Sequence, residues 1–201
     1  MNILILGGTG KIGYEIFKKL SSCDDFNLYT LSRGKNELNS DRHFTFDFFK
    51  NDISNLIIDC RFNIIINCLG IEIFEKEDLL NDIYKKFLDL LNSNSHSKWI
   101  EVSSISTFGV NGFNKIKLLS DYGKAKLFSE GLLKGLSNKK NKNCTIFRFG
   151  AVISKNELND FVLNKFYKFK ILNFFLNFFH NKPYLRITLL EDVNIFINKI
   201  I

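Results

Sequence analysis

Apolar residues recur along the chain with two different periods, and their alternation predicts parallel strands joined by helices. Short apolar runs predict buried strands at residues 3–6, 27–31, 43–47, 63–67 and 98–102. Stretches with apolar residues three and four positions apart separate these runs. They predict amphipathic helices, one directly after residue 10 and another at residues 77–91. This alternation is typical of an α/β fold with a doubly wound parallel sheet.

The first apolar run leads into a turn rich in glycine. Gly8, Gly10 and Gly13 fit the pattern GxGxxG, and Gly7 in place of Gly8 gives GxxGxxG. A side chain on such a turn would keep a pyrophosphate away from the backbone, and one at the third glycine would hold the helix off the strand. The helix that follows presents unpaired N–H groups and its positive dipole end to phosphates. The predicted dinucleotide-binding residues here are Gly7, Gly10, Lys11, Ile12 and Gly13.

Two alternatives for this glycine turn are open. It could be a turn in an α/β domain that holds no cofactor. A nucleoside triphosphate site is disfavoured, because no glycine lies five positions before Gly10. In addition, Ile12 stands where a serine or threonine would have to hold magnesium.

The end of the second predicted strand indicates which dinucleotide the site prefers. In dinucleotide-binding sheets this position faces the adenosine ribose, where an acidic residue selects NAD. Here Ser32 and Arg33 stand about twenty residues beyond the glycines. The arginine offers donors for a 2′-phosphate and a flat cationic face for the adenine, and the serine can add one hydrogen bond. NADP(H) is therefore favoured over NAD(H), the alternative being a solvated arginine in a turn.

Two further strand ends add candidate cofactor contacts. Asp47 ends the third predicted strand and could reach the adenine amino group, or it could equally cap a helix near residues 52–59. Leu69 and Gly70 form the exit turn of the fourth strand. A glycine there fits a backbone that passes close to the cofactor.

The stretch after the fifth predicted strand contains the candidate catalytic residues. Ser104 ends that strand, and Tyr122 and Lys126 begin the next predicted helix, where a spacing of four places them on one face. A tyrosine with a pKa of about 10 is a poor acid or base at neutral pH, and a nearby ammonium favours its phenolate. Ser104, at the carboxyl end of a strand, could hold a substrate oxygen.

Several motifs in this order resemble the short-chain dehydrogenase/reductase superfamily. They are GGTGKIG at residues 7–13, VSSISTFG at 102–109, YGKAK at 122–126 and RFGAVI, expected as a sixth strand, at 148–153. More narrowly, they are similar to its extended branch, the NAD(P)-dependent epimerase/dehydratase family, which acts largely on nucleotide sugars. The resemblance implies a catalytic set of Ser104, Tyr122 and Lys126. It also implies that Tyr122 and Lys126 contact the cofactor, Lys126 at the nicotinamide ribose.

The resemblance further implies two parts of unequal size. Residues 1–152 would form a Rossmann-like NAD(P)-binding domain with the catalytic residues, and residues 153–201 a small substrate-binding segment packed on it. This segment is shorter than the substrate domain of extended members, and Phe108 and Phe149 replace a tyrosine and a proline common in the family. Family members often dimerise through the helix with the tyrosine, so a homodimer is expected on that basis.

An aromatic stretch at residues 161–179 has helical spacing. Its apolar side is formed by Leu172, Phe175, Leu176 and Phe179, with lysines and asparagines on the other side. Such a helix could lie in a membrane interface. The favoured alternative is that it covers the substrate cleft or packs in the core, because long aromatic stripes are usually buried. A last strand at residues 185–189 and a closing helix at 192–200 follow.

Composition narrows the range of functions only slightly. The net charge of +7 could indicate a polyanionic partner. However, the lysines are scattered, and the one dense cluster, at residues 134–142, is expected in a surface loop, so nucleic-acid binding is disfavoured. The histidines are dispersed, so no metal site is expected. No apolar run is long enough to span a membrane, the chain begins directly with a strand, and the cysteines are expected to be reduced and mostly buried. The expected location is therefore the cytoplasm.

These features together predict an NADP-dependent oxidoreductase of the extended short-chain type. The expected activity is reduction or epimerisation of a nucleotide sugar, in the biosynthesis of polysaccharides or cell-surface sugars. Dehydration would need an added acid near the serine loop, where Ile105 and Ser106 follow Ser104. The alternative is a non-catalytic protein of the same fold that senses NADPH, although an intact Ser, Tyr and Lys set argues against it.

Overall fold

The computed structural model describes residues 1–34, 38, 40–47, 50–51, 61–70, 77–108, 110–111, 117–118, 121–140, 143–153 and 187–189. The chain divides into two compact units, Met1–Arg148 and Phe149–Ile201. The helix expected near residues 52–59, the aromatic stretch 161–179 and the closing helix 192–200 all lie outside the described residues.

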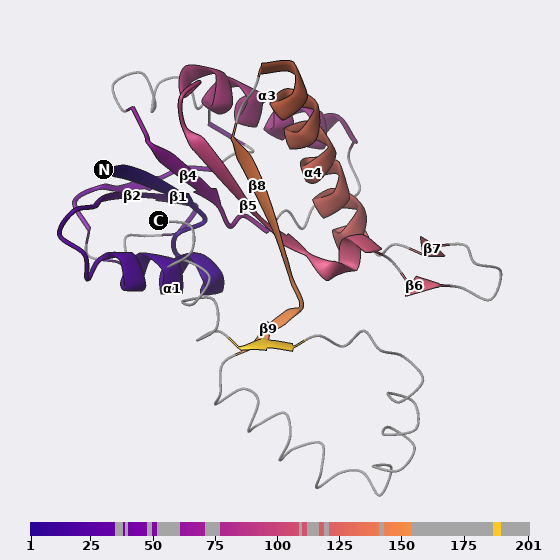
Figure 1. The fold of residues 1–201 in the computed structure, drawn as a ribbon, viewed down its shortest axis with the longest axis horizontal. Helices are drawn as coiled ribbons and strands as arrows, with labels where there is room; N and C mark the ends of the chain where they lie inside the picture. Colours follow the sequence, from indigo (N-terminus) through magenta and orange to yellow (C-terminus); the bar gives the residue numbers. More distant parts are fainter. Residues whose placement is uncertain are drawn as a thin grey trace, which may run out of the picture. The chain divides into compact units, whose positions relative to one another are not determined.

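A six-stranded sheet forms the centre of the first unit (Figure 1). Its strands lie in the order β3-β2-β1-β4-β5-β8. They are β1 (Asn2–Leu6), β2 (Asn27–Ser32), β3 (His43–Thr45), β4 (Ile64–Asn67), β5 (Lys98–Ser104) and β8 (Cys144–Phe149). β1 pairs in parallel with both β2 and β4, β2 with β3, and β4 with β5. This order confirms the doubly wound Rossmann-like sheet. The chain adds strands on one side of β1 up to β3 and then on its other side from β4, so the topological switch point lies between β1 and β4.

Helices cover both faces of this sheet. They are α1 (Lys11–Leu20), α3 (Glu77–Ser93) and α4 (Asp121–Lys140). Figure 1 shows α1 on one side of the sheet and α3 and α4 on the other. Ile3, Leu4, Ile5 and Leu6 in β1 are all essentially inaccessible to solvent. A strand that is apolar at successive positions is expected where both faces of a parallel sheet are buried.

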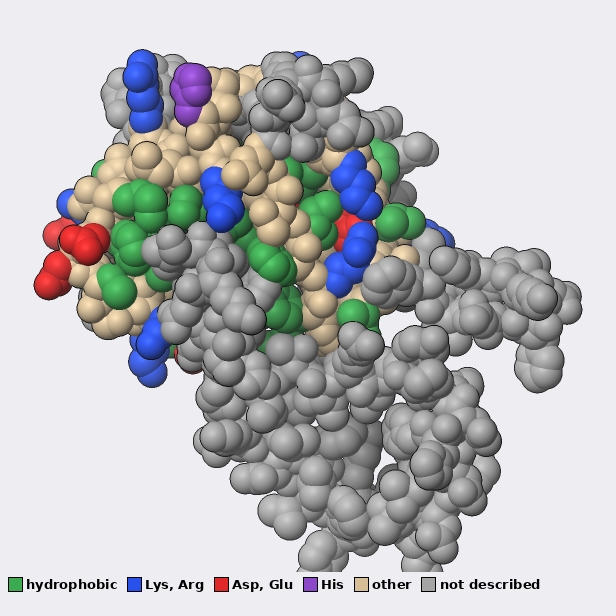
Figure 2. Space-filling model, viewed as in Figure 1, with side chains coloured by type: hydrophobic (Ala, Val, Ile, Leu, Met, Phe, Trp, Pro, Cys, Tyr) green, Lys and Arg blue, Asp and Glu red, His purple; other side chains and the backbone are tan. Residues whose placement is uncertain are grey.

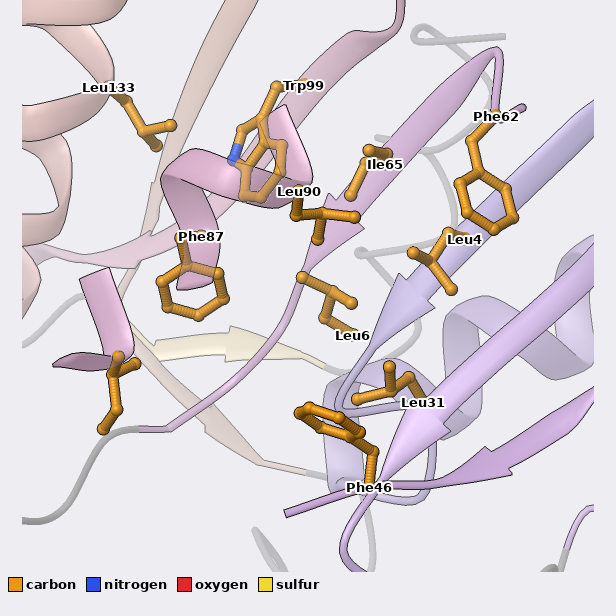
Figure 3. Packing of buried hydrophobic residues seen from close by; sticks show 11 residues of the cluster. Leu4, Leu6, Leu31, Phe46, Phe62, Ile65, Phe87, Leu90, Trp99 and Leu133 are labelled. Carbon is orange, nitrogen blue, oxygen red and sulfur yellow. The ribbon is translucent and has the colours of Figure 1, made fainter. Parts of the chain in front are cut away.

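The main hydrophobic core lies between the sheet and helices α3 and α4. Leu4 and Leu6 from β1 and Ile65 from β4 belong to one buried cluster with residues of these helices (Figure 3). The helical members labelled in the figure are Phe87, Leu90 and Leu133. Phe87 meets the indole of Trp99 edge to face, with ring centroids 6.2 Å apart, a favoured aromatic geometry.

Two short pairs of strands lie outside the main sheet. β6 (Val110–Asn111) and β7 (Lys117–Leu118) form an antiparallel pair after the 3-10 helix η1 (Ile105–Phe108). In the second unit, β9 (Ala151–Ile153) pairs in parallel with β10 (Ile187–Leu189). The expectation that RFGAVI forms the sixth strand is wrong in its bounds. The sixth strand of the sheet is β8, which ends at Phe149, and the chain then leaves the sheet at Gly150 to form a separate pair.

The lysine cluster at residues 134–142 is expected in a loop, but its described part, residues 134–140, is helical, because α4 continues to Lys140. Lysine and leucine are good helix formers, and positive charge near a helix C-terminus is favourable. On the face shown in Figure 2, the described Lys and Arg side chains do not merge into one continuous basic patch. Within the described part of the chain, no helix is both long and apolar enough to cross a membrane. Of the cysteines described there, Cys23 is exposed rather than buried, and Cys68 and Cys144 are partly exposed; all three are free thiols.

Candidate functional site

The glycine turn after β1 has the geometry that the GxxGxxG pattern predicts. Gly7 has φ of 77°, in the left-handed region that favours glycine, and its N–H donates to the carbonyl of Leu31 over 2.7 Å. Gly10 precedes the first helical residue of α1, and its N–H bonds to the Gly7 carbonyl at 2.9 Å. A Cβ on Gly13 would lie 2.2 Å from that same carbonyl oxygen. Only glycine at position 13 lets α1 pack this closely on the turn.

The glycine turn at residues 7–10 and the N-terminus of α1 together form a backbone surface that is called the glycine cradle below. A Cβ on Gly8 would lie 2.8 Å from the side chain of Thr30 in β2. Gly10 caps α1 without a side-chain hydrogen bond, and the first turn of the helix contains no acidic residue. Lys11 is exposed there and Ile12 is partly buried. Open N–H groups at a helix N-terminus, without a competing carboxylate, form an anion-binding geometry.

The end of β2 lies against this cradle. A Cβ on Gly34 would be 3.2 Å from the hydroxyl oxygen of Thr9, so the turn after β2 approaches the glycine turn. Ser32 is buried, and its hydroxyl is 3.5 Å from the Gly34 carbonyl oxygen. The Arg33 side chain is exposed at this edge.

His43 supports the same turn, a role that its position in the sequence does not suggest. Its Nε2 lies 3.2 Å from the Gly34 carbonyl oxygen and its Nδ1 lies 2.8 Å from the Thr30 hydroxyl. A carbonyl can only accept, so Nε2 donates, and Nδ1 of the neutral ring accepts from Thr30. The imidazole thus ties β2 and β3 to the turn that presents Arg33.

Asp47, just after β3, forms a turn through its backbone. Its carbonyl accepts from the N–H groups of Lys50 and Asn51, and its own N–H donates to the Asn51 side chain at 2.9 Å.

The exit of β4 also meets the glycine turn. A Cβ on Gly7 would lie 3.2 Å from the backbone carbonyl of Cys68. Leu69 donates its N–H to the Asn67 side chain over 3.2 Å. A Cβ on Gly70 would meet no atom of the described residues within 4 Å, so their packing does not require a glycine there.

Lys126 joins this exit to β5. Its side chain is buried, and its ammonium donates to the Leu69 carbonyl at 2.9 Å and to the Val102 carbonyl at 2.8 Å. An ammonium has three donors, and these two bonds hold it beside the carboxyl ends of β4 and β5. That edge is where ligands bind in open α/β sheets.

Ser104 and Tyr122 lie on segments that contact each other. Ser104 ends β5, and its hydroxyl oxygen accepts from the N–H of Ser106 at 3.2 Å and the hydroxyl of Ser106 at 2.9 Å. The 3-10 helix η1 packs against α4, which begins one residue before Tyr122. Tyr122 remains 39% exposed, so its ring is accessible from solvent.

Sequence analysis missed two buried carboxylates behind these residues. Glu101 in β5 accepts hydrogen bonds from Asn67, Trp99 and Ser129. Glu130 in α4 accepts from the Ser103 hydroxyl at 2.6 Å and from the Arg148 guanidinium. Glu101 occupies a position in an apolar strand, so the hydrophobic pattern gave no sign of its partners.

The pKa values of these two carboxyl groups are shifted in opposite directions. Burial raises the pKa of Glu101, while the charge of Lys126 and the three hydrogen bonds oppose that rise. Burial would also raise the pKa of Glu130, but the hydrogen bonds from Arg148 and Ser103 and the nearby positive charges outweigh it and lower that pKa. Glu130 thus has a direct cationic partner, whereas Glu101 is held by neutral donors.

Comparisons with solved structures agree with the fold. A UDP-glucuronic acid 4-epimerase from Bacillus cereus, in complex with NAD, superposes with a TM-score of 0.59 at 21% identity; the match covers 76% of this chain and 57% of that one. A UDP-glucose 4-epimerase gives a TM-score of 0.64 at 18% identity, over 76% of this chain and 52% of that one. A thiolation-reductase di-domain from an archaeal non-ribosomal peptide synthetase gives 0.63 at 17% identity, over 81% and 57%.

This chain thus spans little more than half the length of each of these proteins. No curated protein matches it significantly in sequence. The sequence profile of one family, described as the NAD dependent epimerase/dehydratase family, matches residues 3–191, nearly the whole chain. That match confirms the resemblance seen in the sequence motifs, and the chain therefore belongs to the NAD dependent epimerase/dehydratase family.

Proposed function

We propose that this protein is an NADP-dependent oxidoreductase that reduces or epimerises a nucleotide sugar. The observation that carries the proposal is the placement of Lys126, whose buried ammonium is fixed by the carbonyls of Leu69 and Val102. One helical turn earlier, Tyr122 is exposed on the same helix. A fixed cation close to an accessible phenol suits proton transfer at neutral pH.

The glycine cradle fits a dinucleotide. Side chains at positions 8 and 13 would collide with Thr30 and with the backbone of Gly7, so the turn is kept bare where a pyrophosphate would lie. Gly7, Gly10, Lys11, Ile12 and Gly13 would hold the phosphates, and Leu69 and Gly70 would line the nicotinamide side. When bound, the nicotinamide supplies hydride transfer to or from a substrate carbon.

Each catalytic candidate has a distinct role in this proposal. Tyr122 gives or takes the proton of the substrate hydroxyl, and Lys126 keeps the phenol reactive and donates its remaining N–H to the ribose. Ser104 orients the substrate oxygen. The Ser106 hydroxyl, 2.9 Å from that of Ser104, donates to it and thereby leaves the Ser104 proton free to point at a ligand.

The preference for NADP rests on the end of β2. Arg33 is exposed beside the cradle and Ser32 is buried behind it. A 2′-phosphate would gain a charge-assisted hydrogen bond from the guanidinium, which a plain ribose would not. The Bacillus cereus structure is a complex with NAD, so a preference for NADP would distinguish this chain from that protein.

The substrate class is carried over from the relatives. Structures of this fold include epimerases in complex with UDP-glucuronic acid and with UDP-N-acetylmuramic acid. The thiolation-reductase di-domain shows that the same fold also occurs in a protein named as a reductase. The described part of the serine loop contains Ile105, Ser106 and Thr107 and no carboxylate, which supports reduction or epimerisation over dehydration.

Two parts of the proposal concern organisation. Residues 1–152 would serve as the cofactor domain, and residues 153–201 as a small substrate-binding segment. A homodimer formed through α4 is proposed from the family alone, and Leu127 and Phe128 are exposed large apolar residues on that helix. The second candidate function is a non-catalytic NADPH sensor, which the same glycine cradle would support.

The experiment that tests catalysis replaces Tyr122 with Phe and Lys126 with Met, and uses a panel of UDP-sugars and their keto derivatives. Reduction is followed by NADPH oxidation, and epimerisation, which consumes no NADPH overall, by chromatography of the sugar products. Tyr14, exposed on α1, provides the matched control in Tyr14→Phe. An enzyme should lose turnover by about 100-fold or more in Tyr122→Phe while retaining NADPH affinity. If no substrate in the panel reacts but NADPH still binds, the sensor is favoured.

A further inference from the structure

Glu101 is a fully buried carboxylate in a central strand of the sheet. Its Oε2 accepts from Asn67 Nδ2 of β4 at 2.8 Å and from Trp99 Nε1 of β5 at 3.2 Å. Its Oε1 accepts from Ser129 Oγ of α4 at 2.9 Å. One carboxyl group thus connects three elements that together surround Lys126.

The position of Glu101 relative to Lys126 is set by these same elements. Val102, whose carbonyl accepts from the Lys126 ammonium, is the next residue in β5. Ser129, which donates to Glu101, lies three positions after Lys126 in α4 and hence on the same side of the helix. The Glu101 carboxyl group therefore links the strand β5, which accepts from Lys126, to the helix α4, which contains Lys126.

The buried positive charge of Lys126 requires a negative charge nearby. Lys126 is buried, and the contacts that hold it are neutral carbonyls. A buried cation without a compensating anion is costly. Glu130, the other buried carboxylate nearby, is already paired with Arg148. Among the described residues, that leaves Glu101: burial raises the pKa of its carboxyl, and the charge of Lys126 opposes that rise and favours the carboxylate.

The hydrogen bonds around Glu101 accommodate either protonation state. Asn67 Nδ2 and Trp99 Nε1 can only donate, and both address the same oxygen. Ser129 addresses the other oxygen, and a hydroxyl can donate to a carboxylate or accept from a carboxylic acid. Loss or gain of a proton therefore needs only a rotation of the Ser129 hydroxyl. The same reasoning indicates that a glutamine would fit, with its NH₂ group donating to Ser129.

We propose that Glu101 is a positioning residue for the reaction: as a buried carboxylate behind the active site, it balances the charge of Lys126 and fixes the α4 face that bears Tyr122 and Lys126. This inference rests on the proposed function of that face. The substitution that isolates the charge is Glu101→Gln, because it keeps shape and hydrogen bonds. Ser129→Ala is the matched control, since it removes one hydrogen bond and keeps the charge.

Removal of a negative charge makes every neighbouring group release its proton at lower pH. The groups that face Glu101 from adjoining elements are Lys126 on α4 and Cys68 after β4, with Tyr122 one turn before Lys126. Burial raises the pKa of Cys68 to about 12, so the thiol stays neutral over the tested range. Glu101→Gln should therefore move the pH profile of kcat/KM towards lower pH by about one unit, while Ser129→Ala should leave its position unchanged.

A second readout needs no substrate. Ionisation of Tyr122 is followed by tyrosinate absorbance, as the difference between each protein and its Tyr122→Phe counterpart. The expected result is that Tyr122 ionises at lower pH in Glu101→Gln than in the unmodified protein or in Ser129→Ala. A tyrosinate shift without any turnover in the unmodified protein would reject the proposed function but retain the charge coupling. The proposal is overturned if the titration of Tyr122 is the same in Glu101→Gln, if Ser129→Ala reproduces its shift, or if Glu101→Gln does not fold.

Discussion

A Cβ at position 13 would lie 2.2 Å from the carbonyl oxygen of Gly7 and 2.9 Å from its carbonyl carbon. The obstructing atoms belong to the backbone of the turn, so a flexible side chain cannot move aside to relieve the overlap. Position 13 thus links the packing of α1 on β1 to the shape of the phosphate cradle.

Gly13→Ala should therefore weaken both folding and cofactor binding. Overpacking a fixed contact costs about 1–3 kcal/mol of unfolding free energy, measurable by urea unfolding followed by circular dichroism. The stabilisation by NADPH should also be lost. Gly131→Ala is the control, because a Cβ there meets no atom of the described residues within 4 Å; in the interior of α4 it should stabilise by about 0.5–1 kcal/mol. Equal stability of Gly13→Ala and the unmodified protein would contradict this packing.

The ion pair of Glu130 and Arg148 should make the unfolding free energy depend on pH in the acid range. The pKa of Glu130 is lowered below its ordinary value of 4.5 in the folded chain. Its contribution is therefore present above that value and is lost as the pH falls through the lower folded pKa. The unfolding free energy of the unmodified protein should decline over this interval, and Glu130→Gln should show a flatter decline. If the unfolding free energies of the two proteins decline with pH in parallel, Glu130 does not contribute to the decline.

Arg148→Met tests the same ion pair by removal of its cationic partner. Among the described residues, it leaves a fully buried carboxylate with Lys134, at 3.9 Å, as its cationic neighbour. Breaking such a pair should cost about 2–4 kcal/mol at neutral pH. Thermal or urea unfolding measures the loss, and the double variant Arg148→Met with Glu130→Gln should recover part of it. Failure of the second substitution to recover any stability would argue against an uncompensated charge.

Glu101 should show the opposite dependence. Burial raises its pKa above the ordinary value of 4.5, so the unfolded chain releases this proton first as the pH rises. Stability therefore falls as the pH increases from that value towards the folded pKa. Glu101→Gln should remove this pH dependence, so its unfolding free energy should stay flat over the interval where that of the unmodified protein falls, while its activity profile changes. An equal fall of the unfolding free energy in both proteins would show that the Glu101 carboxyl does not cause it.

The core between the sheet and α3 can be tested at Leu90, which is fully buried. Leu90→Ala removes apolar contacts with the cluster around Phe87 and Trp99 and should cost about 2–5 kcal/mol. Tyr14 is 43% exposed on α1, which is not the helix proposed for the dimer, so Tyr14→Ala should change stability by less than about 0.5 kcal/mol. If both substitutions cost the same, the assignment of Leu90 to the core and of Tyr14 to the surface would be wrong.

Much of the fold could be predicted because its signals are local. The apolar runs of β1 and β4 and the glycines at 7, 10 and 13 each have a short-range physical cause. The sequence could not show that β8 ends at Phe149 and that Ala151–Ile153 pairs with Ile187–Leu189, because strand pairing over such separations depends on tertiary packing. The dense lysines at the end of α4 predict a loop, whereas the helix propensity of lysine and leucine is consistent with the continuation of the helix to Lys140.

The candidate site was predicted in part for the same reason. Ser104, Tyr122 and Lys126 belong to compact motifs, whereas the groups that hold them are distant in sequence. Leu69 binds Lys126 through a backbone carbonyl, which no side-chain pattern can reveal. Glu101 and Ser129 are 28 positions apart and meet only in the folded chain. His43 supports the turn of Arg33, whereas in the sequence it is only one of the dispersed histidines that disfavour a metal site.

The central claim is that the glycine cradle and Arg33 form an NADP site, and a thermal-shift titration with NADPH and with NADH tests it most directly. A ligand that binds only the folded chain raises Tm according to RT ln(1 + [L]/Kd). The unmodified protein should show the larger shift with NADPH, and Arg33→Asp should reverse that order. The same shift with both dinucleotides would contradict the role of Arg33, and no shift with either would contradict the cofactor site itself.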